Sequence, residues 1–292
     1  MTTVTPRSIC AIGAELGEGP VWHSADRGLW FVDIKAPAIH RFDPSAGSLR
    51  SWISPEPVGW VLPTRKGQMM AGLKSGLHLF DPVNGRFEFI APIEADNPQN
   101  RLNDAATDRK GRIWFGTMDD SEREAAGRFY VFDRGHVRDT GLPPVKITNG
   151  PALCPDGRIL YHVDTVGQVI YATELAADGS LGSTREFVRF ARDEGYPDGP
   201  TVDSEGCVWI ALFSGWAARR YSPAGELLES VRFPVSNVTK LAFGGTDLRT
   251  VYATTARLHL RAEQLAEQPQ AGNLFSFDVA VAGLPVTPVA LG

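Results

Sequence analysis

The chain has 292 residues and a formal net charge of −5, with 29 basic and 34 acidic side chains. This weak acidity, without a basic cluster mixed with aromatic residues, argues against a nucleic-acid partner. No apolar run reaches the roughly 18 residues of a membrane span, and the stretch MTTVTPRSICAIG lacks the apolar core of a signal peptide, so we expect no membrane partner.

One sequence element recurs along the whole chain: a turn rich in Gly, Asp and Arg, followed by an apolar pair. It reads ADRGLWFVD, TRKGQMMAG, DRKGRIWFG, PDGRILYHV, DSEGCVWIA and GTDLRTVYA. The marker residues Trp30, Met70, Trp114, Leu160, Trp209 and Tyr252 are separated by 40, 44, 46, 49 and 43 residues. Each marker is followed by a short strand pattern that ends in a polar turn, as in HRFDPSAG and HLFDPVNG, which is typical of hairpins.

Each repeat therefore predicts four short strands, and repeats of about 40 to 50 residues with four strands are typical of propeller blades. The regular long period disfavours a β-sandwich, and a solenoid rarely has four strands per repeat. We expect an all-β, six-bladed β-propeller with four-stranded antiparallel blades, forming a single domain over residues 1–292. A strand near Ser8 to Ile12 should pair with the last blade and close the ring. Helical periodicity is confined to LRAEQLAEQ, residues 260–268.

Three cysteines, Cys10, Cys154 and Cys207, are scattered along the chain and form no CxxC pair. Such cysteines are typical of small buried hydrophobic residues in a reducing compartment. We expect a cytoplasmic protein without disulfides.

The stretch LGEGPVWH places Glu18 between two glycines, directly before a pattern typical of a buried strand. An isolated carboxylate beside a core is costly unless it is paired or bound to a cation. Glu18 lies 12 residues before its marker, and Asn103, Asn149 and Asp198 each lie 11 residues before theirs. Because the first strand of every propeller blade lines the central channel, these four side chains should converge at one mouth of that channel.

The convergence of two carboxylates with neutral amides predicts a divalent cation between them. Oxygen donors suit Ca²⁺, Mg²⁺ or Mn²⁺, with Fe²⁺ or Zn²⁺ as further candidates. The alternative is that these residues only form turns, as Asn and Asp often do, but turn chemistry does not explain Glu18. The second and sixth repeats carry Gly59–Trp60 and residues 239–241 near the same phase, which we expect to supply walls and not ligands.

The sequence resembles the gluconolactonase / senescence-marker-protein (regucalcin-like) family of six-bladed sugar-lactone hydrolases over nearly the whole chain. The resemblance is carried by LGEGPVWH, FVDI, GLKSGLHLFD, NRLNDAATDRKGRIWFGTM, ITNGPALCPDG, YPDGPTVDSEGCVWIA and FGGTDLRTVYATTAR. It is most similar to the bacterial sugar-lactone lactonase branch, the xylonolactonase-like enzymes, which implies aldonolactones such as xylonolactone, arabinolactone or gluconolactone as substrates.

The resemblance also implies roles for individual residues: metal ligation by Glu18, Asn149 and Asp198, substrate contact by Arg101 and Asn103, and support of the site by Asp104. Asp198 is further implied as the general base. One segment departs from the family pattern, because GTMDDSERE has Ser121 nearest the place where some members carry a sugar-contacting glutamate. Asp119, Asp120 and Glu122 are the candidates to replace it.

The expected chemistry is lactone hydrolysis, in which a metal polarises the carbonyl and acidifies a water, and Asp198 transfers the proton. No GxSxG or HExxH motif supports another hydrolytic design. His162 is expected to be a core histidine, and Trp60 and Tyr196 are candidates for stacking on a sugar. The alternatives are a calcium-binding regulatory propeller without significant lactonase activity, a propeller that binds partners through its rim, and a phosphotriester or aryl-ester hydrolase.

Overall fold

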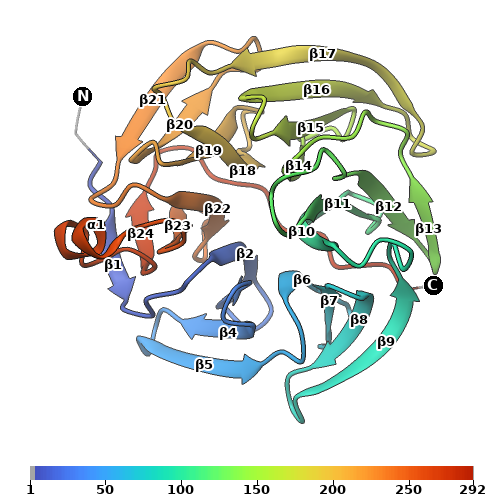
Figure 1. The fold of residues 1–292 in the computed structure, drawn as a ribbon, viewed down its shortest axis with the longest axis horizontal. Helices are drawn as coiled ribbons and strands as arrows, with labels where there is room; N and C mark the ends of the chain where they lie inside the picture. The colour runs from blue at the N-terminus through green and yellow to red at the C-terminus, as the bar shows by residue number, and fades with distance from the viewer. Residues whose placement is uncertain (1–3, 292) are drawn as a thin grey trace.

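The computed structural model describes residues 4–291, and these residues are almost entirely β-structure. Figure 1 shows the sheets arranged as a ring around a centre. Four sheets each contain four antiparallel strands in chain order. The chain is therefore all-β, and its four-stranded antiparallel sheets match the architecture of a β-propeller.

The bounds of the strands follow the repeats. The first sheet contains β2 (Gly17–His23), β3 (Gly28–Asp33), β4 (Ala38–Asp43) and β5 (Ser48–Ile53). The second contains β6 (Val58–Pro63), β7 (Met69–Leu73), β8 (Gly76–Asp81) and β9 (Arg86–Pro92). The third contains β10 (Asn100–Thr107), β11 (Ile113–Asp119), β12 (Phe129–Asp133) and β13 (His136–Asp139). The fourth contains β14 (Thr148–Leu153), β15 (Ile159–Asp164), β16 (Val169–Leu175) and β17 (Leu181–Arg189).

A fifth sheet has eight strands, in the order β1-β24-β23-β22-β18-β19-β20-β21. Its members are β1 (Arg7–Cys10), β18 (Tyr196–Val202), β19 (Val208–Phe213), β20 (Ala217–Tyr221), β21 (Leu227–Arg232), β22 (Val238–Gly244), β23 (Thr250–Thr255) and β24 (Leu274–Asp278). A single parallel pair, Gly199 with Lys240, joins its two antiparallel halves. Strand β1 pairs with β24, which confirms the expected closure by the N-terminal strand.

The short helix α1 (Ala262–Glu267) falls inside the one segment with helical periodicity. In the part of the chain that the structure describes, no helix is long and apolar enough to cross a membrane. Cys10, Cys154 and Cys207 are free cysteines; Cys207 is buried as predicted, whereas Cys10 and Cys154 are partly exposed, so the prediction of burial is wrong for these two.

The repeated turn and its marker have a shared physical basis. The indole Nε1 of Trp30, Trp114 and Trp209 donates to the turn aspartates Asp26, Asp108 and Asp203, at 3.2, 3.0 and 3.0 Å respectively. All six markers are buried, so the recurring pattern reflects packing between strands. The marker tryptophans are thus explained by the core.

The innermost strands β2, β6, β10, β14, β18 and β22 lie nearest the centre of the ring (Figure 1). All six share an interruption of pairing with the next strand, which follows Glu18 in β2, Val58 in β6, Leu102 in β10, Asn149 in β14, Pro197 in β18 and Val238 in β22. Such bulges bend a strand and redirect its side chains. The interruptions therefore coincide with the positions that the repeat phase had aligned.

Candidate functional site

A cavity of about 390 Å³ brings together the residues that the repeat phase had aligned. Its lining includes Glu18 from β2, Arg101 and Asn103 from β10, Asn149 from β14 and Asp198 from β18. Five of the six predicted site residues therefore share one cavity. The sixth, Asp104, lies outside this lining and is described below.

Two buried carboxylates face this cavity. Glu18 and Asp198 are 4% and 6% exposed. Burial, followed by repulsion from Asp104, raises the pKa of Glu18 to about 8. Burial, followed by repulsion from Glu18 and Asp104, raises the pKa of Asp198 well above its usual range. One Glu18 oxygen accepts a 2.9 Å hydrogen bond from the amide of Gly19.

These carboxylates fit a cation, because a divalent ion would offset both buried charges. The described residues contain no group of three or more His, Cys, Asp or Glu side chains placed to hold a metal. A metal at this cavity would therefore depend on an amide oxygen as its third protein ligand. Hard cations such as Ca²⁺ accept amide as well as carboxylate oxygens.

The side-chain amide of Asn149 is oriented by two neighbours. Its Nδ2 donates a 2.9 Å hydrogen bond to Oγ1 of Thr165, and its Oδ1 accepts one of 3.3 Å from Nδ2 of Asn103. These contacts assign the oxygen of the amide, and that oxygen retains acceptor capacity. The amide of Asn149 is thus held in one orientation by its neighbours.

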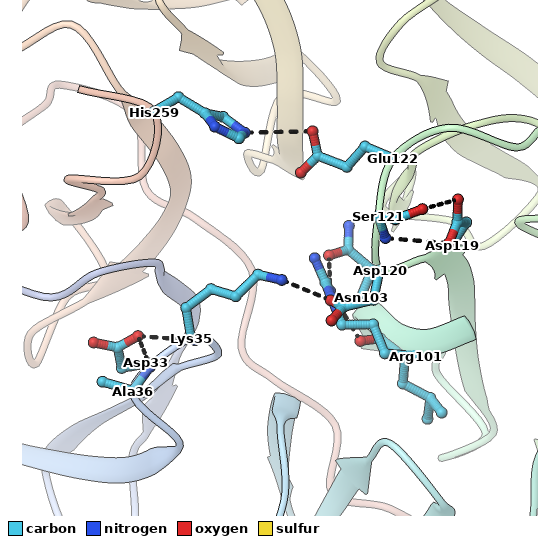
Figure 2. A network of polar contacts seen from close by, with 11 residues as sticks. Asp33, Lys35, Ala36, Arg101, Asn103, Asp119, Asp120, Ser121, Glu122 and His259 are labelled. Carbon is cyan, nitrogen blue, oxygen red and sulfur yellow. Dashed lines mark hydrogen bonds and ion pairs between the residues drawn. The ribbon is translucent and has the colours of Figure 1, made fainter. Parts of the chain in front are cut away.

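The guanidinium of Arg101 donates to two side-chain acceptors and to the carbonyl of Leu102. Its Nη1 donates to Oδ1 of Asn103 and its Nε to Oδ1 of Asp120, both at 2.6 Å. Asp120 also accepts a 2.8 Å hydrogen bond from Nζ of Lys35, which reaches across from the segment after β3 (Figure 2). Nδ2 of Asn103 donates a 2.6 Å hydrogen bond to the backbone carbonyl of Thr148. Asn103 therefore acts mainly on Arg101 and on the strand that carries Asn149.

The structure separates the three acidic candidates that follow Met118. Asp119 closes its own turn by accepting hydrogen bonds from Ser121 and from backbone amides. Asp120 holds Arg101 and Lys35. Glu122 alone lines the cavity, and its Oε2 lies 3.3 Å from Nε2 of His259, which lines the cavity too (Figure 2).

One charged residue was missed at the sequence level. Lys240 is buried and its Nζ forms an ion pair with Oδ1 of Asp104. The other oxygen of Asp104 accepts a 2.8 Å hydrogen bond from the amide of Gly150, directly after Asn149. Lys240 lies in residues 239–241, for which the sequence predicts a wall of the channel and no charged contact.

Two aromatic predictions are settled by burial. His162 is a core residue, because its Nε2 bonds Oγ1 of Thr173 at 3.0 Å and burial lowers its pKa to about 4. Trp60 is fully buried and lines a second cavity, of about 440 Å³, which is formed by the innermost strands, the residues that follow them and residues 284–287. The stacking role considered for Trp60 is therefore wrong. Tyr196 does line the site cavity and is 42% exposed, so its stacking role stays a prediction.

Comparisons with known proteins agree with this fold. A family model described as SMP-30/Gluconolactonase/LRE-like region matches residues 16–257. The chain is 36% identical over 269 residues to 6-deoxy-6-sulfogluconolactonase of Pseudomonas putida, covering 92% of both chains. It is 30% identical over 276 residues to regucalcin of Danio rerio, covering 93% of both. The crystal structure of regucalcin from Agrobacterium tumefaciens, described as a calcium-binding protein, matches with a TM-score of 0.94 at 27% identity and covers 99% of each chain.

The fold thus defines the class of protein, an all-β ring of four-stranded sheets with a cavity lined by residues of the innermost strands. The chain belongs to the SMP-30/gluconolactonase/LRE-like family. The resemblance inferred from the sequence motifs is confirmed.

Proposed function

We propose that this protein is a metal-dependent hydrolase that opens the ring of sugar lactones to give aldonic acids. The observation that carries the proposal is the pair of buried carboxylates, Glu18 and Asp198, facing one cavity together with Arg101. We further propose a single six-bladed domain over residues 1–292, in which the eight-stranded sheet comprises two blades joined at Gly199 and Lys240.

Glu18, Asn149 and Asp198 would hold one divalent metal, with Ca, Mn, Fe, Zn and Mg as the candidates. When bound, such an ion supplies Lewis acidity toward the lactone carbonyl and lowers the pKa of a water. The family supports this assignment, since the similar regucalcin structure is described as a calcium-binding protein.

The residues of this chain would transfer the proton, stabilise developing charge and support the site. A water adds to the carbonyl carbon, and Asp198 accepts the proton that the water loses. The bond between that carbon and the ring oxygen then breaks, and Asp198 returns the proton to the ring oxygen, leaving a hydroxy acid. The guanidinium of Arg101, held by Asn103 and Asp120, would donate to oxygen atoms that gain negative charge. Asp104 would support the site through the amide of Gly150.

The substrate class is supported by the family and by the size of the cavity. Aldonolactones such as xylonolactone, arabinolactone and gluconolactone are the candidates, together with the sulfonated lactone that the name of the Pseudomonas putida relative indicates. The partner that we propose for the protein is therefore a small-molecule lactone, and we propose no nucleic-acid or membrane partner. A cytoplasmic location stays a prediction.

The deciding experiment is an assay of the purified protein on a panel of aldonolactones, first in EDTA and then with each divalent metal restored. We expect turnover only after metal is restored. Tight calcium binding without turnover of any lactone would instead favour a regulatory calcium-binding propeller, the alternative that the similarity to regucalcin supports.

A further inference from the structure

The buried ion pair of Asp104 and Lys240 lies between the two cavities. Lys240 lines the second cavity, as does Ala105, which directly follows Asp104. Asn103, which directly precedes Asp104, lines the site cavity. The pair is therefore part of the wall that separates the site from the second cavity, and its two charges lie next to the site without lining it.

Five buried charged side chains from four innermost strands belong to this region. They are the carboxylates of Glu18, Asp104 and Asp198 and the cations of Arg101 and Lys240, and their exposed fractions are between 1% and 6%. Burial is the largest cause of the raised pKa of both Glu18 and Asp198; the charge of Asp104 adds to it and the charge of Lys240 opposes it. When all five are ionised, one negative charge is uncompensated, and a divalent metal would more than offset it.

The contacts of Lys240 place its charge beside the candidate metal ligands. Its Nζ forms the ion pair with Oδ1 of Asp104, whose other oxygen accepts the amide of Gly150 at 2.8 Å. The aliphatic stem of the lysine packs against Gly199, which directly follows Asp198. The ammonium group is therefore fixed within the same buried cluster as the two carboxylates that face the site cavity.

We propose that Lys240 is an internal counter-cation, which offsets part of the buried negative charge in the metal-free protein and weakens the binding of a divalent metal at the site. This inference rests on the metal site of the proposed function. Buried carboxylates are costly without a compensating charge, so the ammonium stabilises the chain before metal binds. It is also a like charge to the metal, and like charges repel strongly where water is excluded.

Lys240→Met tests the proposal, because it keeps an apolar stem and removes the charge. We expect its Kd for Ca²⁺ and for Mn²⁺, measured by calorimetric titration, to be lower than that of the unaltered protein by about tenfold or more. Lys240→Arg retains the charge and should bind both metals as the unaltered protein does. If Lys240 only supported the strands that carry the ligands, Lys240→Met would instead bind metal more weakly. Unchanged or weaker binding in folded Lys240→Met would overturn the proposal.

A second comparison tests the same charge if Lys240→Met does not fold. Asp104→Asn and the double variant that combines it with Lys240→Met differ only at position 240. The double variant removes one charge of each sign, so it should bind Ca²⁺ more tightly than Asp104→Asn and about as tightly as the unaltered protein. Equal or weaker binding by the double variant would contradict the proposal.

The control is Lys66→Met, at an exposed position in the turn between β6 and β7, which should leave metal affinity unchanged. A comparable gain of affinity in Lys66→Met would show that the net charge of the protein causes the effect, against the proposal. If the unaltered protein binds no divalent metal, the proposed function itself fails. If it binds metal but neither comparison shows tighter binding, only this inference fails.

Discussion

Lys240 on β22 and Asp104 on β10 form a buried ion pair between strands of different sheets. The second oxygen of Asp104 accepts a hydrogen bond from the backbone amide of Gly150. The aliphatic part of the Lys240 side chain packs on Gly199, where a Cβ atom added to the glycine would lie 2.5 Å from Cγ of the lysine. The pair thus touches the residues that directly follow Asn149 and Asp198. It links four innermost strands, β10, β14, β18 and β22, immediately beside the candidate metal ligands.

Breaking this pair from either side should destabilise the fold, because it leaves one uncompensated buried charge. We expect Lys240→Met and Asp104→Asn each to lower the free energy of unfolding by roughly 3 kcal/mol. The double variant should lose much less than the sum of the two. Urea unfolding of the four proteins, all without metal, measures the coupling. Strictly additive losses would show that the two side chains do not stabilise each other.

The ring of site residues could be predicted because each of its members occupies the same phase in a repeat. Local turn chemistry and buried markers such as Trp30 and Trp114 set that phase, and both are visible in the sequence. The partner of Lys240 could not be predicted, since Asp104 lies 136 residues away and the contact depends on how the ring closes. The sequence also could not show which acidic residue after Met118 lines the cavity. Glu122 does so, and it has a left-handed φ of 60° that redirects the chain.

The metal assignment predicts a specific effect of Glu18→Gln. This change keeps the shape of the side chain and removes one of two buried negative charges, so metal affinity should fall by at least about tenfold. Calorimetric titration with Ca²⁺ and Mn²⁺ measures the effect. Glu205→Gln, with a side chain 61% exposed, is the matched control and should bind metal as the unaltered protein does. Normal affinity in Glu18→Gln would remove Glu18 from the ligand set.

Substitutions of Arg101 and Asn103 should differ in their effect on metal affinity, although the two side chains are hydrogen-bonded to each other. Arg101→Ala should lower kcat/KM on a lactone by about 100-fold while metal affinity stays the same, because the arginine would donate to developing charge. Asn103→Ala should lower kcat/KM and also weaken metal binding, since Asn103 donates to Oδ1 of Asn149. Steady-state kinetics and metal titration on the same samples distinguish the two. A loss of metal affinity in Arg101→Ala would contradict the division of roles.

Two buried histidines predict how stability depends on pH. Burial lowers the pKa of His40 and of His162 to about 4, from an ordinary value of 6.5. Between these values the unfolded chain binds more protons than the folded one, so stability is complete above about pH 6.5 and falls as the pH drops toward 4. His40→Asn and His162→Gln, which retain a polar group near Nδ1 and Nε2 respectively, should each flatten this part of the profile. Thermal unfolding from pH 4 to 8 tests this, and an unchanged slope in both variants would show that other groups control it.

We propose two roles for Asp198, as a metal ligand and as the general base, and one substitution distinguishes them. Asn at this position could still offer an amide oxygen to a metal, but it could not accept the proton of the attacking water. We therefore expect Asp198→Asn, saturated with metal, to bind the ion yet lose at least about 100-fold in kcat, the scale for removal of a general base. Titration establishes saturation, and single-turnover kinetics at saturating lactone then isolates the chemical step. A kcat near that of the unaltered protein would place the base elsewhere. Asp104 is a poor substitute, because Lys240 and the amide of Gly150 already occupy its two oxygens.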